Sequence, residues 1–166
     1  EELFLPGVMR VTYDCFADER GTIFTPFDHG LEEQMNLKGF QRFCHDKIVC
    51  NKKDVFRGIH FDNATTKLVS CLSGRIEQFV ICVDEAAKEF GQYFHCELSP
   101  GSGSILIPAG YGNALIAKEE NSVYWYKLAY RGHYRDADEQ RTIKWNDPRF
   151  EIDWGQTNLI RSSRDA

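Results

Sequence analysis

The sequence predicts an all-β fold, a small barrel or sandwich built from short strands and hairpins. Aromatic and β-branched residues gather in short runs, and Gly, Pro, Asn and Asp separate these runs. The runs recur at a spacing of roughly ten residues, which is typical of sandwiches and barrels. Strands do not alternate with helices and no glycine-rich nucleotide loop is present, so the sequence excludes a Rossmann-type fold.

The expected strands have the length and composition of half-buried or buried β-structure. In chain order they are Val8–Tyr13, Thr22–Thr25, Val55–Phe61, Lys67–Leu72, Arg75–Val83, Tyr93–Leu98, Ser104–Ile107, Ala114–Ile116 and Ser122–Tyr130. Only Leu31–Leu37 has the pattern of a short helix, and Arg135–Gln140 is expected to add a helical turn.

Two turns support a closed all-β architecture. Leu72–Arg75 predicts a tight turn between two strands, in which Gly74 is free to adopt a positive φ. Ile105–Gly110 ends a strand at a turn bounded by proline. Paired hairpins of this kind are how small barrels close their edges.

Length and composition indicate one ordinary domain, expected to span residues 1–166. The net charge of −5 argues against non-specific binding to nucleic acid. No apolar run approaches the ~20 residues of a membrane helix, and the N-terminus lacks a secretion signal pattern. The six cysteines form no CxxC pair, and Cys71, Cys82 and Cys96 fall in apolar runs, so we expect reduced thiols in a cytoplasmic protein.

The densest group of chemically useful residues is Val55–Phe61, followed by Lys67. Strand alternation is expected to place Arg57 on one face, and Gly58 and His60 on the other. Gly58 would then leave open space for a ligand beside the histidine, and Lys67 could point into the same cavity. Taken alone, this pattern is explained better by a half-buried histidine in a strand and a surface lysine.

Aromatic residues alternate along Ser122–Tyr130. Tyr124, Tyr126, Leu128 and Tyr130 are expected to share one face of this strand. Most buried tyrosines simply pack and keep a bonded hydroxyl. One tyrosine that faces a cavity could nevertheless serve as a general acid.

The histidines give no support for a metal site. His29, His45, His60, His95 and His133 are dispersed, with no HxH and no histidine–carboxylate triad at ligand spacing. We therefore expect neither a metal nor another cofactor. Near the C-terminus, Asp165 lies in a polar tail, where a solvated carboxylate is the ordinary expectation.

Together these segments resemble the dTDP-4-keto-6-deoxyglucose 3,5-epimerase (dTDP-4-dehydrorhamnose 3,5-epimerase) family. The matching landmarks occur in the family's order through almost the whole chain: Asp18–Gly21, Val55–Phe61, Lys67–Val69, Gly74, Phe90–Gln92, Leu98–Ser99, Ile107–Gly110, Tyr126–Lys127, Trp145–Asp147, Ile152–Trp154 and Ser162–Asp165. The resemblance implies a cupin-type jelly-roll barrel with short peripheral helices, forming a single epimerase domain. It also implies a metal-free homodimer that acts on a nucleoside-diphosphate 4-keto sugar.

The resemblance assigns a role to four residues. His60 matches the family's catalytic base, and Asp165 matches the carboxylate that pairs with it. Lys67 matches the lysine beside the substrate carbonyl, and Tyr126 matches the tyrosine acid on the opposite face of the sugar. Among substrate-binding residues, Arg20 and Arg57 match positions that hold the diphosphate, and the remaining candidates are Phe24, Lys47, Asn113 and Arg164.

Three positions depart from the family pattern. Gly112–Asn113 stands where a histidine usually follows the Ile-Pro-x-Gly turn, Phe24–Pro26 lacks the usual glutamate, and His45–Lys47 replaces a Gln-x-Asn segment. These changes call thymidine into question as the base. The stretch Tyr126–Tyr134, continuing to Trp145–Asp147, more closely resembles a branch acting on GDP-4-keto-6-deoxy-heptoses in capsule biosynthesis.

The expected function is inversion of carbon 3, carbon 5 or both through an enolate, for capsule or O-antigen sugars. A 4-ketone acidifies both positions, and Tyr126 favours action at carbon 5 or at both carbons. One alternative is a keto-sugar isomerase, which would more often pair two histidines in the cavity. Others are a non-catalytic sugar-binding barrel, which would not need His60, Lys67 and Tyr126 together, and a metal-dependent dioxygenase.

Overall fold

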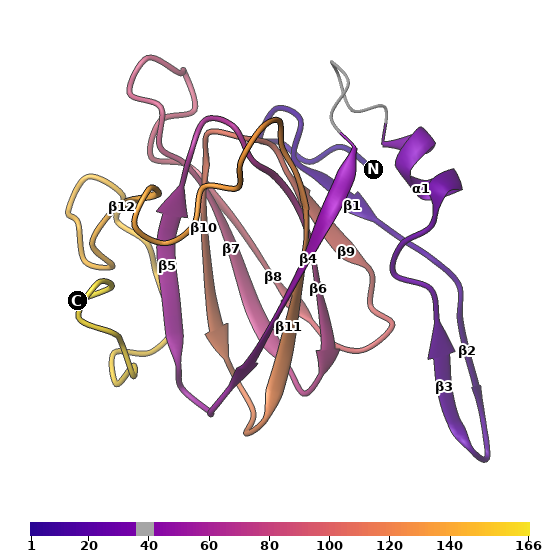
Figure 1. The fold of residues 1–166 in the computed structure, drawn as a ribbon. Coiled ribbons are helices and arrows are strands. Elements are labelled where there is room, and N and C mark those ends of the chain that lie inside the picture. The colour runs from indigo at the N-terminus through magenta and orange to yellow at the C-terminus, as the bar shows by residue number, and fades with distance from the viewer. Residues whose placement is uncertain (36–41) are drawn as a thin grey trace.

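The computed structural model describes residues 1–35 and 42–166, and within them the chain forms two five-stranded antiparallel sheets, a separate hairpin and one short helix (Figure 1). The first sheet has the order β1 (Met9–Val11), β9 (Ser104–Ile107), β6 (Thr66–Ser73), β11 (Ser122–Ala129) and β4 (Phe43–Asn51). The second has the order β12 (Arg141–Thr142), β5 (Phe56–Phe61), β10 (Tyr111–Ala117), β7 (Ile76–Cys82) and β8 (Tyr93–Leu98). The hairpin consists of β2 (Cys15–Asp18) and β3 (Gly21–Phe24), and the helix is α1 (His29–Gln34).

The main hydrophobic core lies between the two sheets. Val69 and Ile105 from the first sheet and Val80 and Leu115 from the second are fully buried in one cluster. Because side chains alternate along a strand, every second residue of each sheet faces this interior. The arrangement confirms the predicted all-β architecture.

A second cluster covers the outer face of the second sheet. Phe150, Trp154 and Leu159 from the C-terminal segment pack there with Phe56 of β5 and Phe79 of β7. This packing holds the end of the chain along β5, where the main chain of Val55 also forms a bridge with Ile160. The C-terminal tail is therefore an ordered part of the fold, which matters for the position of Asp165.

Most predicted elements occur, with different bounds. Strands β2, β4 and β12 were not predicted, and the expected Ala114–Ile116 segment is the middle of the longer β10. Helix α1 begins at His29, where the Asp28 carboxylate caps it by accepting from Leu31 N at 2.8 Å. It ends at Gln34, and the last two residues of the expected helix lie outside the described residues. The helical turn expected at Arg135–Gln140 is present as a single turn, in which the main-chain nitrogens of Glu139 and Gln140 donate to the carbonyl of Asp136.

An irregularity in β5 overturns the predicted separation of Arg57 from His60. From Asn113 to Leu115, β10 advances two residues, whereas its partner β5 advances three, from His60 to Arg57. The extra residue is a bulge, and a bulge breaks the strict alternation of faces. Arg57 and His60 consequently both face the interior, while Phe56 and Ile59 both pack in the outer cluster.

Gly58 does not open space for a ligand, contrary to expectation. A Cβ at this position would lie 2.4 Å from the Cβ of Ala114, and the residue has a φ of 139°. Only glycine allows the bulged strand to approach β10 so closely. At the β6–β7 turn, in contrast, the predicted positive φ of Gly74 is confirmed at 73°.

The burial of the cysteines follows the apolar runs of the sequence. All six cysteines are free thiols, with Cys71 and Cys82 buried and Cys96 half-buried. The part of the chain that the structure describes contains no helix with the length and hydropathy needed to cross a membrane.

Candidate active site

The interior of the barrel opens at one end into a cavity of about 180 Å³. Seven of the ten predicted site residues line it: Lys47, Arg57, His60, Lys67, Asn113, Tyr126 and Arg164. Pockets that enclose a drug-sized ligand usually measure ~300–1,000 Å³. The cavity is therefore of a size to hold a sugar ring, with the remainder of a larger ligand outside it.

His60 and Asp165 form a hydrogen-bonded pair at the wall of this cavity. His60 Nε2 lies 2.6 Å from Asp165 Oδ1, and the other carboxylate oxygen accepts from Ser162 Oγ at 2.9 Å. Burial by itself would raise the pKa of Asp165. The hydrogen bonds from His60 and Ser162 and the charge of Arg164 nevertheless hold that pKa below its ordinary value. Asp165 is only 3% exposed, so the expectation of a solvated tail residue was wrong.

This pair determines which nitrogen of His60 can act. An ionised carboxylate only accepts hydrogen bonds, so His60 carries its proton on Nε2. Nδ1 is then the basic nitrogen, and it makes no hydrogen bond to any described residue. The ring is thereby oriented as in other histidine–carboxylate pairs, with Nδ1 directed away from the carboxylate.

Lys67 places an ammonium group inside the cavity, from the start of β6 on the opposite sheet. Its side chain is 5% exposed, and none of the described carboxylates lies within salt-bridge distance of it. The pKa of Lys67 is lowered to about 8, chiefly by burial; the charge of Asp62 opposes this shift and the nearby charge of Arg164 adds to it. Near neutral pH the cavity thus holds a buried cation available to a developing negative charge.

The pKa of Lys67 predicts a basic limb in the pH–rate profile. Above pH 8 the ammonium loses its proton, so kcat is expected to fall as the pH rises through about 8. Lys67→Met should lower kcat at neutral pH and remove this limb, and initial rates between pH 6 and 10.5 check both. A wild-type rate that stays constant until the ordinary lysine range, about pH 10, would contradict the assignment.

Tyr126 faces the cavity from β11, on the sheet opposite to the one that carries His60. Its ring packs at right angles to that of Tyr124, with the centroids 4.6 Å apart, and Leu128 lines the cavity beside it. Burial raises the pKa of Tyr126, although Arg57 opposes the shift. The hydroxyl therefore keeps its proton at neutral pH and can donate it from the wall facing His60.

Arg57 and Arg164 add fixed positive charge to the cavity. Arg57 Nε donates to Asn51 Oδ1 at 2.8 Å, and Arg164 Nε donates to Thr142 Oγ1 at 2.9 Å. Both partners are neutral, so the two guanidinium charges stay available for an anionic ligand. Guanidinium groups held in this way suit phosphate oxygens, to which they can donate two hydrogen bonds at once.

The segment after β11 contributes residues that were not predicted. Lys47 Nζ lies 2.6 Å from Asp136 Oδ1 and 5.2 Å from the centroid of the Tyr134 ring. Tyr134, Asp136 and Gln140 line the cavity with Lys47. A helical turn was expected at Arg135–Gln140, but a short turn does not show which of its side chains reach a site. The only signal in this part of the sequence was the aromatic stretch that ends at Tyr134.

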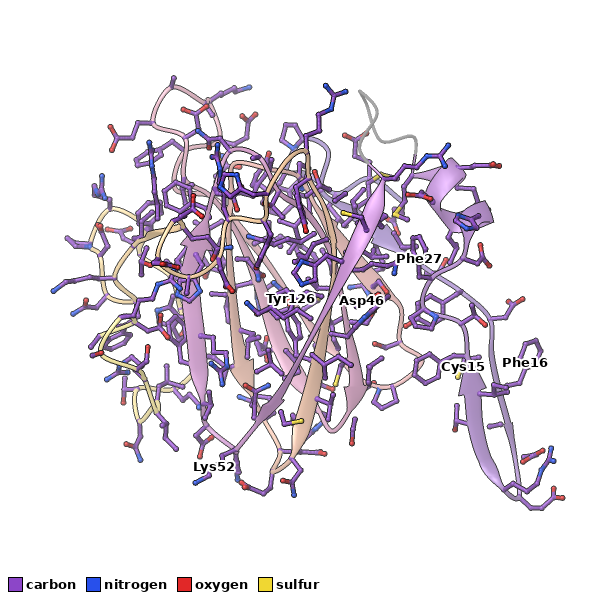
Figure 2. All side chains as sticks on the ribbon, viewed as in Figure 1. Cys15, Phe16, Phe27, Asp46, Lys52 and Tyr126 are labelled. Carbon is purple, nitrogen blue, oxygen red and sulfur yellow. The ribbon has the colours of Figure 1, made fainter. Side chains whose placement is uncertain are left out.

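Arg20 and Phe24 do not reach the cavity in this chain. They lie on the β2–β3 hairpin, which projects from the rest of the chain (Figure 1). The Arg20 side chain is 83% exposed and forms an ion pair with Asp18, and the Phe24 ring stacks on Tyr13 at 5.8 Å. Figure 2 shows the hairpin far from Tyr126 in the barrel.

The chemistry available in the cavity is transfer of protons at carbon. It contains an imidazole, a protonated phenol on the facing wall, a buried ammonium group and two guanidinium groups. Among residues 1–35 and 42–166, no three His, Cys, Asp or Glu side chains come together in the arrangement that a metal site needs.

Comparison with known proteins gives a consistent picture. The family model described as dTDP-4-dehydrorhamnose 3,5-epimerase matches residues 2–166. The dTDP-4-dehydrorhamnose 3,5-epimerase of Escherichia coli K12 is 30% identical, over 90% of this chain and 82% of its own length.

Two crystal structures share the fold. The dTDP-4-dehydrorhamnose 3,5-epimerase of Elizabethkingia anophelis NUHP1 superposes with a TM-score of 0.84 at 27% identity, covering 99% of this chain and 91% of that one. A dTDP-6-deoxy-D-glucose-3,5-epimerase from Legionella pneumophila, in complex with dTDP-4-keto-L-rhamnose, gives a TM-score of 0.87 at 24% identity, covering 99% and 87%. The similarity confirms the predicted cupin-type fold.

Proposed function

This chain belongs to the dTDP-4-dehydrorhamnose 3,5-epimerase family, and on that basis we propose how it acts and on what. It inverts carbon 3, carbon 5 or both of a nucleoside-diphosphate 4-keto-6-deoxy sugar, with the whole chain acting as one epimerase domain. The observation that carries the proposal is the arrangement of His60 with Asp165 on one wall of the cavity and of Lys67 and Tyr126 on the other.

Each step uses a group that the geometry supplies. His60 Nδ1 removes the proton from the carbon beside the ketone, and Asp165 stabilises the imidazolium that forms. The electron pair moves to the ketone oxygen, where Lys67 stabilises the enolate by roughly 3–4 kcal/mol. Tyr126 then donates its proton to the opposite face of the same carbon, which inverts that centre. Exchange with solvent returns a proton to Tyr126 and removes one from His60.

The surrounding cations support a diphosphate substrate. Arg57 and Arg164 keep their charge available, and the cavity itself has room for the sugar alone. The nucleotide therefore lies beyond the sugar cavity. The sequence departs from the family pattern at Phe24–Pro26, which lies outside the cavity, and at His45–Lys47, of which Lys47 lines it. We favour a GDP-4-keto-6-deoxy-heptose for capsule or O-antigen synthesis over a dTDP-hexose. Turnover of both sugar nucleotides, measured side by side, tests this preference, and a dTDP-hexose turned over faster would reverse it.

The residues that line the cavity also favour an epimerase over a keto-sugar isomerase. His60 is the one histidine among the described residues that line it. A keto-sugar isomerase that uses a pair of histidines is therefore less well supported than an epimerase with a histidine and a tyrosine.

Activity is expected to survive removal of metal ions. The base, the acid and the cation that stabilises the enolate are all side chains of this chain, and no step requires a Lewis acid. Dialysis against EDTA should leave the rate unchanged, with elemental analysis of the dialysed protein as the control. A loss of activity that one added metal restores would contradict the proposal.

The hairpin supports a homodimer. Phe16 and Ile23 face each other across β2 and β3 and are 65% and 72% exposed, an unusual position for a cross-strand apolar pair. In a dimer, this hairpin would pack on the partner and bring Arg20 and Phe24 to the partner's cavity. Sedimentation should show a dimer for the wild-type protein and a monomer for a Phe16→Glu, Ile23→Glu variant. A monomeric, fully active wild-type protein would contradict this arrangement.

A further inference from the structure

Asn113 occupies the cavity wall directly beside the proposed base. It lies on β10 in register with His60 on β5, and its side chain is 6% exposed. It is also a position where the sequence departs from its family. A buried amide must direct its oxygen and its nitrogen toward different partners, so its orientation determines what it offers to a ligand.

Gln78 of β7 fixes that orientation from the interior of the barrel. Its Nε2 donates to Asn113 Oδ1 at 2.7 Å, to the carbonyl of Phe79 at 2.7 Å and to that of Ala114 at 3.2 Å. Its Oε1 accepts from the hydroxyl of Tyr124. The nitrogen of Gln78 thus meets only acceptors. In the reverse orientation the Gln78 oxygen would face these three oxygens and all three bonds would be lost, whereas only the bond to the Tyr124 hydroxyl, which can also accept, could be remade.

The orientation of Asn113 follows from that of Gln78. Reversing Asn113 would place its NH₂ group against the NH₂ group of Gln78, two donors with no acceptor between them. Its oxygen must therefore stay on Gln78, and Nδ2 is left with two N–H donors. No described residue accepts a hydrogen bond from Nδ2, and Asn113 lines the cavity.

We propose that Gln78 and Tyr124 are positioning residues that hold Asn113 with its NH₂ group toward the substrate ketone. This inference rests on the proposed function. A carbonyl or enolate oxygen can only accept hydrogen bonds, whereas a sugar hydroxyl can also donate them. The NH₂ group of Asn113 can only donate, and it lies next to the base. It therefore matches the ketone oxygen, whose carbon is adjacent to the carbon that loses its proton. Unlike Lys67, this donor is neutral and does not titrate.

Kinetics of three variants test the proposal with the better of the two substrates, dTDP-4-keto-6-deoxyglucose or a GDP-4-keto-6-deoxy-heptose. Asn113→Asp keeps an oxygen for Gln78 but presents a carboxylate oxygen to the enolate, so kcat is expected to fall roughly 10²–10³-fold. Gln78→Met and Tyr124→Phe touch no substrate, yet kcat should fall about tenfold while KM changes little. Tyr111→Phe is the matched control, because its hydroxyl donates to the Pro6 carbonyl at 3.0 Å outside the cavity.

A purely structural role for the network predicts a different result. Gln78→Met and Tyr124→Phe would then lower the thermal midpoint and leave kcat at the wild-type value in the folded fraction. That outcome would overturn the proposal, as would wild-type kcat in Asn113→Asp.

Hydrogen exchange of the side-chain amides tests the orientation without turnover, and without a variant that must fold. In ¹⁵N-labelled wild-type protein, the Gln78 amide protons should exchange slowly with D₂O and those of Asn113 rapidly. Protected Asn113 protons would overturn the proposed orientation. If the wild type turns over neither sugar, the proposed function fails, and so does the assignment of a ketone as the partner of the Asn113 NH₂ group. The exchange pattern would still decide the orientation of Asn113.

Discussion

His60→Asn is expected to abolish incorporation of solvent deuterium at carbon 3 and carbon 5 of the substrate. The remaining rate should be lower than that of the wild type by at least roughly 10²–10⁴-fold, because the amide cannot take the proton at neutral pH. The loss should appear in kcat, since Arg57 and Arg164, which we propose hold the diphosphate, are unchanged. Exchange is measured by NMR in D₂O.

A matched control separates this effect from a general loss of structure. His95 of β8 also contacts a carboxylate, with Nδ1 2.9 Å from Glu77 Oε1, but it is half-exposed and lies outside the cavity. His95→Asn should retain the wild-type rate. Substantial exchange in a folded His60→Asn protein would remove His60 from the mechanism.

Tyr126→Phe should separate proton abstraction from inversion. Abstraction by His60 uses the other face of the sugar, so the variant should still exchange solvent deuterium into the substrate. Net inversion should fall by roughly 10²–10⁴-fold, because the group that donates from the facing wall is lost. The ratio of deuterium exchange to epimer formation, measured in one NMR sample, is therefore expected to rise.

The control for Tyr126→Phe is the same substitution at Tyr93, which lies outside the cavity. The hydroxyl of Tyr93 accepts from the main-chain nitrogen of Asp153 at 3.2 Å, so Tyr93→Phe removes one hydroxyl at no cost to the site. Wild-type inversion in Tyr126→Phe would show that another group, such as water, delivers the proton.

The strands that could be predicted are those with an apolar inner face. β6 and β7 are buried at nearly every position and β11 at most of its positions, so they stand out in the sequence as runs of apolar and aromatic residues. β4 was not predicted because it is an edge strand whose two faces both mix polar and apolar residues. Lys47 and Val49 face the cavity, whereas Asp46 and Ile48 lie on the exposed face. The two strands β2 and β12 are short and largely exposed.

The bulge in β5 shows what periodicity cannot supply. Alternation alone separated Arg57 from His60, but an extra residue at Gly58 brings both into the cavity. The glycine was recognised as special, yet its neighbour Ala114 lies far along the chain and only the folded register reveals the contact. The local sequence pattern could not show whether the space beside Gly58 is filled by a ligand or by a neighbouring strand.

Contacts between side chains that are far apart in the sequence were the hardest feature to predict from the sequence. Asp165 lies 105 residues after His60, and composition alone indicated a solvated tail. The family resemblance supplied this pair, and the structure shows the packing that makes it possible. The contacts of Asn113 with Gln78 and of Lys47 with Asp136 also join distant segments, and no sequence motif predicted either contact.

The central claim is that this site moves a proton at the carbon next to a ketone, and incubation in D₂O tests it most directly. Wild-type protein would be mixed separately with a dTDP-4-keto-6-deoxy sugar and a GDP-4-keto-6-deoxy sugar, and ¹H NMR would locate the label. With at least one of them, we predict deuterium at carbon 3, carbon 5 or both, together with the inverted epimer. Folded wild-type protein that introduces no deuterium at either carbon of either sugar would contradict the account.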